Sequence, residues 1–236
     1  MTTPIRALLF DVFGTVVDWR TSVSGEIEAL ARSYGVEVDA PAMADVWRAE
    51  YQPAMEEIRQ EKRPFEILDI LHRENLERIL PRFGLAEICE EDKEKLNLCW
   101  HRLQGWSDSS EGLKALKRRF ILATQSNGNI ALIVNMAKGA DLAWDVVLGA
   151  EVIGYYKPRP EAYDKACAQL NLPSEACMMV AAHNDDLVAA RQQGMRTAFV
   201  CRPKEHGPNQ KTDMEPTSNW DYVASSFTDL ASQLKC

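Results

Sequence analysis

Hydrophobic residues follow two different patterns along the chain, and the change between them falls near residues 18 and 106. Short apolar runs that end in polar or glycine-containing turns are typical of buried strands in a parallel sheet. Such runs are found at residues 5–10, 120–124, 146–148, 177–182, 197–201 and 222–224. Within residues 18–106, apolar side chains instead recur at intervals of three and four, which predicts amphipathic helices. The predicted helices are residues 22–34, 43–61, 64–82 and 91–103.

The two patterns predict an α/β fold in two parts. Strands alternate with helices in residues 1–17 and 107–236, as is typical of a doubly wound parallel sheet, a Rossmannoid core. Nothing strand-like interrupts residues 18–106, which we expect to form a separate helical domain inserted after the first strand. Residues 202–216 are rich in Pro, Lys, Asn and Asp, and they are predicted to form a surface loop near the active edge of the sheet.

The first polar group of interest is a carboxylate at the end of a strand. Asp11 follows the apolar run 5–10 directly and precedes a turn that contains Gly14 and Thr15. Open parallel sheets bind their ligands at the carboxyl ends of the strands. A carboxylate in this place can act as a nucleophile and carry a covalent intermediate. It can equally well cap the turn that follows it.

Further polar groups stand where helices are predicted to begin. Residues 125–129 follow a strand and combine a hydroxyl, an amide and a helix N-terminus, which together suit an anion. Lys157 precedes a helix opened by Pro160, and proline is favoured at the first helical position. His183 and Asp186 lie where another strand passes into its helix. The polar groups at the strand exits should therefore meet at one edge of the sheet.

Four motifs occur in order along the chain. They are Asp11 with Gly14 and Thr15, then Ser126-Asn127-Gly128, then Lys157-Pro158, and finally Asp186 with the Ala189-Ala190-Arg191 that follows. Together they resemble the haloacid dehalogenase superfamily, and within it the type II 2-haloacid dehalogenases. The likeness covers nearly the whole chain, and four motifs in this order are far more specific than any one alone. The resemblance implies that residues 18–106 are a helical cap domain that closes over the site and excludes water.

Two positions argue against phosphoryl transfer, the chemistry of the superfamily's larger branch. Its phosphatases carry a general acid two places after the nucleophile, and that place here is Phe13, which cannot exchange a proton. They also use an acid four residues before the last aspartate, where this chain has Ala182. Magnesium binds through carboxylate oxygens in near-octahedral geometry. We therefore expect neither a metal nor another cofactor, although Asp185 keeps a magnesium site from being excluded.

A halide leaves as a stable anion and needs no proton, so both replacements suit a dehalogenase. One alternative is a magnesium-dependent phosphatase that uses Asp185 or Asp186. A more distant alternative is a non-catalytic binding protein on the same scaffold. Loss of Lys157 or Asp186 would favour that second alternative, and both residues are present.

The resemblance implies that Asp11 attacks the halogen-bearing carbon of a short 2-haloacid, forms an ester and inverts the configuration. Lys157 would keep Asp11 ionised, because a nearby cation favours the charged form. Water would then hydrolyse the ester, with Asp186 as its base or orienter. The best known family pattern has serine and asparagine before that acid, where this chain has Ala181 and His183. His183 could itself accept the proton of the water, because imidazole titrates near neutrality.

Other side chains are expected to hold the substrate and the departing halide. Ser126 and backbone amides after the nucleophile would bind the substrate carboxylate, and Thr15 would steady the turn. Asn127 and Arg48 are expected at the halide by resemblance, and arginine suits a dry anion pocket because it is weakly hydrated and always charged. Arg48 could alternatively be a surface residue that pairs with an acid such as Glu50.

Three aromatic residues complete the predicted site. Phe13 and Trp19 flank the nucleophile turn and are expected near the substrate. Tyr163 matches a tyrosine of the family, which either hydrogen-bonds near Lys157 or packs in the core.

Composition agrees with an enzyme that acts on small molecules. The 236 residues are 46% hydrophobic and 26% charged, as is ordinary for a globular protein. A net charge of -8 gives no general attraction to nucleic acid or to an anionic membrane. The expected partners are therefore a 2-haloacid and a halide ion, drawn by the local positive charge of Arg48 and Lys157.

Location and assembly are expectations of a coarser kind. No apolar run approaches the roughly 18 residues that a membrane span requires, and the start of the chain runs straight into the first predicted strand, so we expect a cytoplasmic protein. Six cysteines lack CxxC spacing, which predicts neither a zinc site nor a disulfide framework. The resemblance includes dimers, so a homodimer is a possible assembly.

Overall fold

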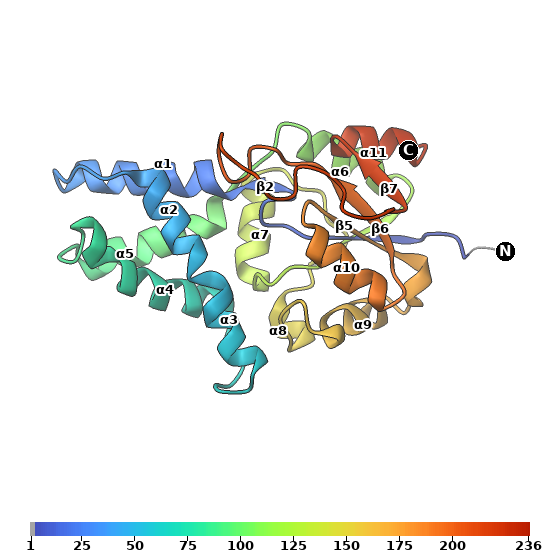
Figure 1. The fold of residues 1–236 in the computed structure, drawn as a ribbon, viewed down its shortest axis with the longest axis horizontal. Helices are drawn as coiled ribbons and strands as arrows, with labels where there is room; N and C mark the ends of the chain where they lie inside the picture. The colour runs from blue at the N-terminus through green and yellow to red at the C-terminus, as the bar shows by residue number, and fades with distance from the viewer. Residues whose placement is uncertain (1–2) are drawn as a thin grey trace.

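A five-stranded parallel sheet runs through the larger part of the molecule, with a group of helices beside it (Figure 1). The computed structural model describes residues 3–236. The spatial order of the strands is β4-β1-β5-β6-β7, and all neighbouring pairs run parallel. The strands are β1 (Ala7–Phe10), β4 (Ile121–Thr124), β5 (Cys177–Ala181), β6 (Arg196–Val200) and β7 (Tyr222–Ala224). The predicted α/β fold class is thereby confirmed.

Helices cover both faces of this sheet. Side chains alternate along β1, so that Leu8 and Phe10 join one hydrophobic core while Ala7 and Leu9 join the other. Helices α6 (Ser109–Lys117), α7 (Ile130–Gly139) and α11 (Phe227–Gln233) contribute to the first core. Helix α8 (Ala150–Ile153) contributes to both cores. Helices α9 (Pro160–Gln169) and α10 (Asn184–Gln192) contribute to the second. Burial on both faces is why these strands are apolar at nearly every position.

The remaining helices form a group beside the sheet, which we call the helical block (Figure 1). It consists of α1 (Trp19–Ser33), α2 (Ala40–Ala49), α3 (Tyr51–Arg59), α4 (Leu68–Ile79), η1 (Leu80–Phe83), α5 (Glu90–Asn97) and η2 (Leu98–Arg102). The chain enters and leaves this block through a short antiparallel pair, β2 (Val17–Asp18) with β3 (Gln104–Gly105). Among residues 3–236, no helix is both long and apolar enough to cross a membrane.

Three details differ from the sequence prediction. The helix expected over residues 43–61 is two helices that meet at Glu50. Pro53 lies in the first turn of α3, where backbone N–H groups have no partner within the helix, so a new helix can begin there without losing a hydrogen bond. The strand expected at residues 146–148 is reduced to a single bridge between Val146 and Ala123. The β2–β3 pair is a strand-like element within residues 18–106, where none was predicted.

Candidate active site

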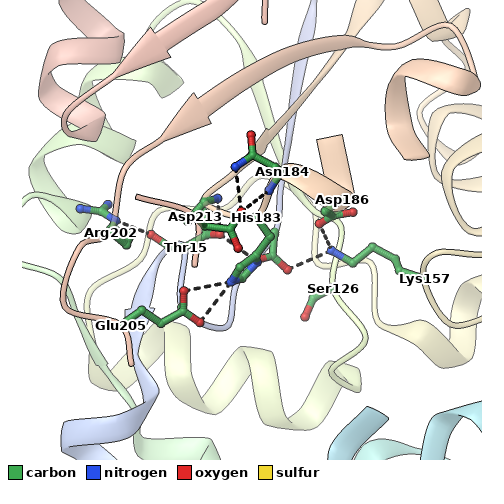
Figure 2. Close-up of polar contacts among 12 residues, drawn as sticks. Thr15, Ser126, Lys157, His183, Asn184, Asp186, Arg202, Glu205 and Asp213 are labelled. Atoms are coloured by element: carbon green, nitrogen blue, oxygen red, sulfur yellow. Dashed lines mark hydrogen bonds and ion pairs between the residues drawn. The ribbon is translucent and has the colours of Figure 1, made fainter. Parts of the chain in front are cut away.

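The carboxyl ends of β1, β4 and β5 open into one cavity of about 890 Å³ between the sheet and the helical block. Its lining residues include Asp11, Phe13, Arg48, Tyr51, Arg59, Asn127, Lys157, Arg159, Tyr163, His183, Asp185, Asp186, Glu205 and His206. Figure 2 shows the polar contacts at the floor of this cavity. Most of the side chains predicted for the site are thus brought together from segments far apart in sequence.

Asp11 is held by three side chains. Its Oδ1 accepts a hydrogen bond from Lys157 Nζ at 2.9 Å. Its Oδ2 accepts one from Thr15 Oγ1 at 2.7 Å and lies 3.1 Å from Nδ1 of His183. Burial alone would raise the pKa of Asp11, but the cations of Lys157 and His183 outweigh it and hold that pKa well below its usual range. Asp11 is therefore an ionised carboxylate with a fixed orientation.

Lys157 lies in the turn between α8 and α9 and joins two carboxylates. Its ammonium also contacts Asp186, whose other oxygen accepts a hydrogen bond from Tyr163 at 2.7 Å. Burial would lower the pKa of Lys157, yet Asp11 and Asp186 together raise it above the usual value. Burial is also the main reason why the pKa of Asp186 is raised. Both oxygens of Asp186 thus accept hydrogen bonds, which fix its carboxylate beside the lysine.

His183 bridges Asp11 and a buried acid that the sequence did not reveal. Its Nε2 lies 2.9 Å from Oε2 of Glu205, which is only 1% exposed (Figure 2). Trp19 donates its indole N–H to the same carboxylate at 3.1 Å, so Trp19 supports Glu205 and does not line the cavity. Glu205 belongs to the loop predicted at the active edge, and that placement was the one available signal. No motif distinguishes it from the other acids of the loop.

The double pairing of His183 has a consequence for stability. Burial would lower the pKa of His183, but Glu205 and Asp11 raise it well above 6.5. A pKa raised by folding stabilises the native state below about pH 6.5, and this contribution is lost as the pH rises through the folded-state value. We expect His183→Gln to cost about 3 kcal/mol of unfolding free energy near pH 6 and less at each higher pH. Urea unfolding of both proteins from about pH 6 to about pH 9 measures this difference, and a cost that grew with pH would contradict it.

Neither Thr15 nor Ser126 lines the cavity, although Thr15 contacts Asp11 directly. The Thr15 hydroxyl donates to Asp11 and accepts from the backbone N–H of Ala182 at 2.9 Å, so it ties β1 to the end of β5. Ser126 accepts a hydrogen bond from the N–H of Gly128 at 3.1 Å, which leaves its own hydroxyl proton available.

The two residues predicted for the halide both line the cavity, Asn127 from the segment after β4 and Arg48 from helix α2. Asn127 uses its carbonyl oxygen to accept from the backbone N–H of Lys157 at 2.8 Å. The Arg48 guanidinium lies 3.9 Å from the centre of the Tyr51 ring, and its buried Nη1 has no hydrogen-bond partner among residues 3–236. Phe13 lies 5.8 Å from the same guanidinium and contributes an apolar wall. A desolvated cation beside aromatic rings suits an anion that is itself weakly hydrated.

The donor set does not suit a magnesium ion. The Lys157 ammonium lies between Asp11 and Asp186 and neutralises the carboxylates that a bridging cation would need. Within the described part of the chain, no group of three or more His, Cys, Asp or Glu side chains is arranged to hold a metal.

A parallel sheet that presents a buried, lysine-paired carboxylate beneath a group of helices indicates a class of enzymes built on an open α/β sheet. Comparison with known sequences identifies which one: residues 5–194 match the haloacid dehalogenase-like hydrolase family. The chain therefore belongs to the haloacid dehalogenase-like hydrolases, as the four motifs predicted.

The most informative relatives are dehalogenases of 2-haloacids. (S)-2-haloacid dehalogenase 1 of Pseudomonas sp. strain CBS-3 is 30% identical over 210 residues, which are 86% of this chain and 88% of that protein. The crystal structure of the defluorinating L-2-haloacid dehalogenase Rha0230 superposes with a TM-score of 0.97 at 44% identity and covers 100% of both chains. The L-2-haloacid dehalogenase PA0810 superposes with a TM-score of 0.94 at 45% identity and covers 98% of this chain and 99% of that one.

Proposed function

We propose that this protein hydrolyses short 2-haloacids, with preference for the L isomer, to 2-hydroxyacids of inverted configuration. The observation that carries the proposal is the ionised Asp11 carboxylate, fixed by Lys157 and followed by Phe13 where a phosphatase needs an acid. The names of the relatives support the substrate class. The proposed catalytic groups are Asp11, Lys157, His183 and Asp186, and the helical block is proposed to act as a cap domain.

The first step is displacement of the halide. An Asp11 oxygen attacks C2 of the substrate, the new carbon–oxygen bond forms as the carbon–halogen bond breaks, and the halide leaves with the bonding electrons. Fixing the carboxylate in line with that bond can supply roughly 7–11 kcal/mol of the barrier. The free Nη1 of Arg48 and the amide of Asn127 supply donors for the halide. Because Ser126 does not line the cavity, the backbone amides that follow Asp11 are the proposed donors for the substrate carboxylate.

The second step is hydrolysis of the ester. Esterification removes the charge of Asp11, one of the two that raise the pKa of His183, so His183 can release its proton to solvent. Neutral His183, oriented by Glu205, then takes a proton from water as that water attacks Cγ of Asp11. The acyl–oxygen bond breaks, and His183 passes that proton to the alkoxide of the product. The second proton of the water then moves from the regenerated carboxyl of Asp11 to His183, which restores the ionised pair. The product hydroxyl oxygen comes from Asp11.

Halide release without added metal tests the proposal. We expect chloride or bromide release from L-2-chloropropionate and L-2-bromopropionate, much slower release from the D isomers, and no change with a chelator, because the cation beside Asp11 is Lys157. Fluoroacetate and chloroacetate extend the series to other halogens and chain lengths. Chelator-sensitive hydrolysis of p-nitrophenyl phosphate with no halide release would instead support the magnesium-dependent phosphatase, which neither the donor set nor the relatives favour.

Two further proposals concern the whole molecule, and the family resemblance supports the second of them. One is that the enzyme works in the cytoplasm, and the other is that it assembles as a homodimer. Size-exclusion chromatography with light scattering measures the second directly.

A further inference from the structure

The catalytic lysine lies on a segment that secondary structure does not hold. Lys157 falls in the turn between α8 and α9, outside every helix and strand. Its backbone groups must therefore find other partners, because a buried peptide group without one is costly. Asn127 accepts from the N–H at 2.8 Å, and this contact comes from the sheet side of the cavity. The carbonyl of Lys157 is held from the opposite side.

That opposite side is helix α3 of the helical block. Arg59, the last residue of α3, donates its Nη1 to the carbonyl oxygen of Lys157 at 2.9 Å. In return, Arg159 donates its Nη1 to the carbonyl oxygen of Arg59 at 3.0 Å. Two side-chain-to-backbone hydrogen bonds thus cross the junction between the helical block and the turn that carries Lys157. We call this pair of bonds the arginine latch.

The surroundings of Arg59 fix its geometry. Its Nε pairs with Glu56 at 2.7 Å, its Nη2 donates to the side-chain oxygen of Gln52 at 3.1 Å, and its side chain is only 11% exposed. Every nitrogen of the guanidinium therefore has a partner within the protein, which fixes the plane of the group. A third contact supports the same junction, because the hydroxyl of Tyr156 donates to the carbonyl oxygen of Glu66 at 2.6 Å.

We propose that Arg59 is a positioning residue for the reaction, which holds the Lys157 turn so that the lysine ammonium stays between Asp11 and Asp186. The inference rests on the proposed function, since it assigns Arg59 a part in the same site. It makes the lysine–nucleophile pair depend on the seating of α3 against the turn. Loss of the latch lets the ammonium move away from Asp11, and that carboxylate then becomes a weaker nucleophile with a higher pKa.

Two substitutions at one position separate geometry from charge. Arg59→Met removes all the hydrogen bonds, while Arg59→Lys keeps the charge and the pairing with Glu56 but loses the fork that reaches several acceptors at once. We expect both to lower kcat on L-2-chloropropionate by about tenfold to a hundredfold. In the pH dependence of kcat, the fall on the acid side should also move to higher pH, because Asp11 would have a higher pKa. Arg32→Met is the matched control, because Arg32 is 75% exposed and pairs only with Glu28.

Lysine labelling by acetic anhydride gives a readout that does not depend on turnover. The paired, buried Lys157 should be acetylated slowly in the wild type and at least about tenfold faster in both variants at position 59, with the other lysines as internal reference. The inference would be overturned if both variants kept the acid limb and the labelling rate of the wild type. It would also be overturned if Arg59→Met raised only KM and Arg59→Lys restored it. If the wild type releases no halide, the proposed function fails while the labelling still decides the latch. Arg59→Lys preserves the test if Arg59→Met does not fold.

Discussion

Replacing Asp11 by alanine or asparagine is expected to abolish halide release, with kcat reduced by about 10⁴-fold or more. The loss is this large because no other described oxygen is held between Lys157 and His183 to attack the substrate. Ion chromatography of chloride or bromide from L-2-halopropionates measures it. The alanine variant is needed beside the asparagine variant, since an amide can convert slowly to the acid.

The matched control for this result is Asp164→Asn. Asp164 is adjacent to Tyr163 in sequence but lies on the exposed side of α9, so the variant should retain wild-type turnover. A single turnover in water enriched in heavy oxygen adds a direct test of the ester. The first product should carry ordinary oxygen from the enzyme. Undiminished turnover by Asp11→Ala, or heavy oxygen in the first product, would exclude the ester route.

His183→Gln is expected to separate the two steps and to trap the intermediate. Halide should appear as a burst equal to the amount of enzyme, after which steady turnover falls by about 10²- to 10⁴-fold. The first step survives because Lys157 and Thr15 still hold Asp11, whereas the water has lost its base. Rapid-quench halide assays measure the burst, and intact mass spectrometry should find the acyl adduct on a peptide that contains residue 11.

Glu205→Gln provides the companion measurement for this trap. Glutamine keeps the shape and can still contact His183, but it removes the charge that orients and polarises the imidazole. We expect the same burst and adduct with a smaller loss of turnover. If both variants lacked the adduct and the burst, His183 and Glu205 would act before the ester forms.

How much of the site was predictable depended on how local each signal was. Asp11 could be identified because it ends an apolar run and is followed three residues later by Gly14, and Lys157 because it directly precedes Pro158 near the start of a helix. The sheet followed from runs that are apolar because both faces are buried. The family and fold class predicted from these signals are the ones found.

Other features were beyond a single sequence. Glu205 acquires its place only when the loop after β6 folds back against His183, and a loop acid has no periodic pattern. Arg59 acts through a backbone carbonyl nearly a hundred residues away, and a carbonyl leaves no mark in the sequence. The strand expected at residues 146–148 failed because an edge segment with one bridge has the same apolar composition as a true strand.

The β2–β3 pair places the two ends of the helical block next to each other, with Val17 opposite Gly105. An excursion of this length therefore replaces a single connection of the sheet and leaves the order of the parallel strands untouched. The sheet and the helical block can then vary separately in evolution or design, because the block is inserted at one junction. One constraint remains, because any replacement for the helical block must still place a hydrogen-bond donor where Arg59 reaches the Lys157 carbonyl.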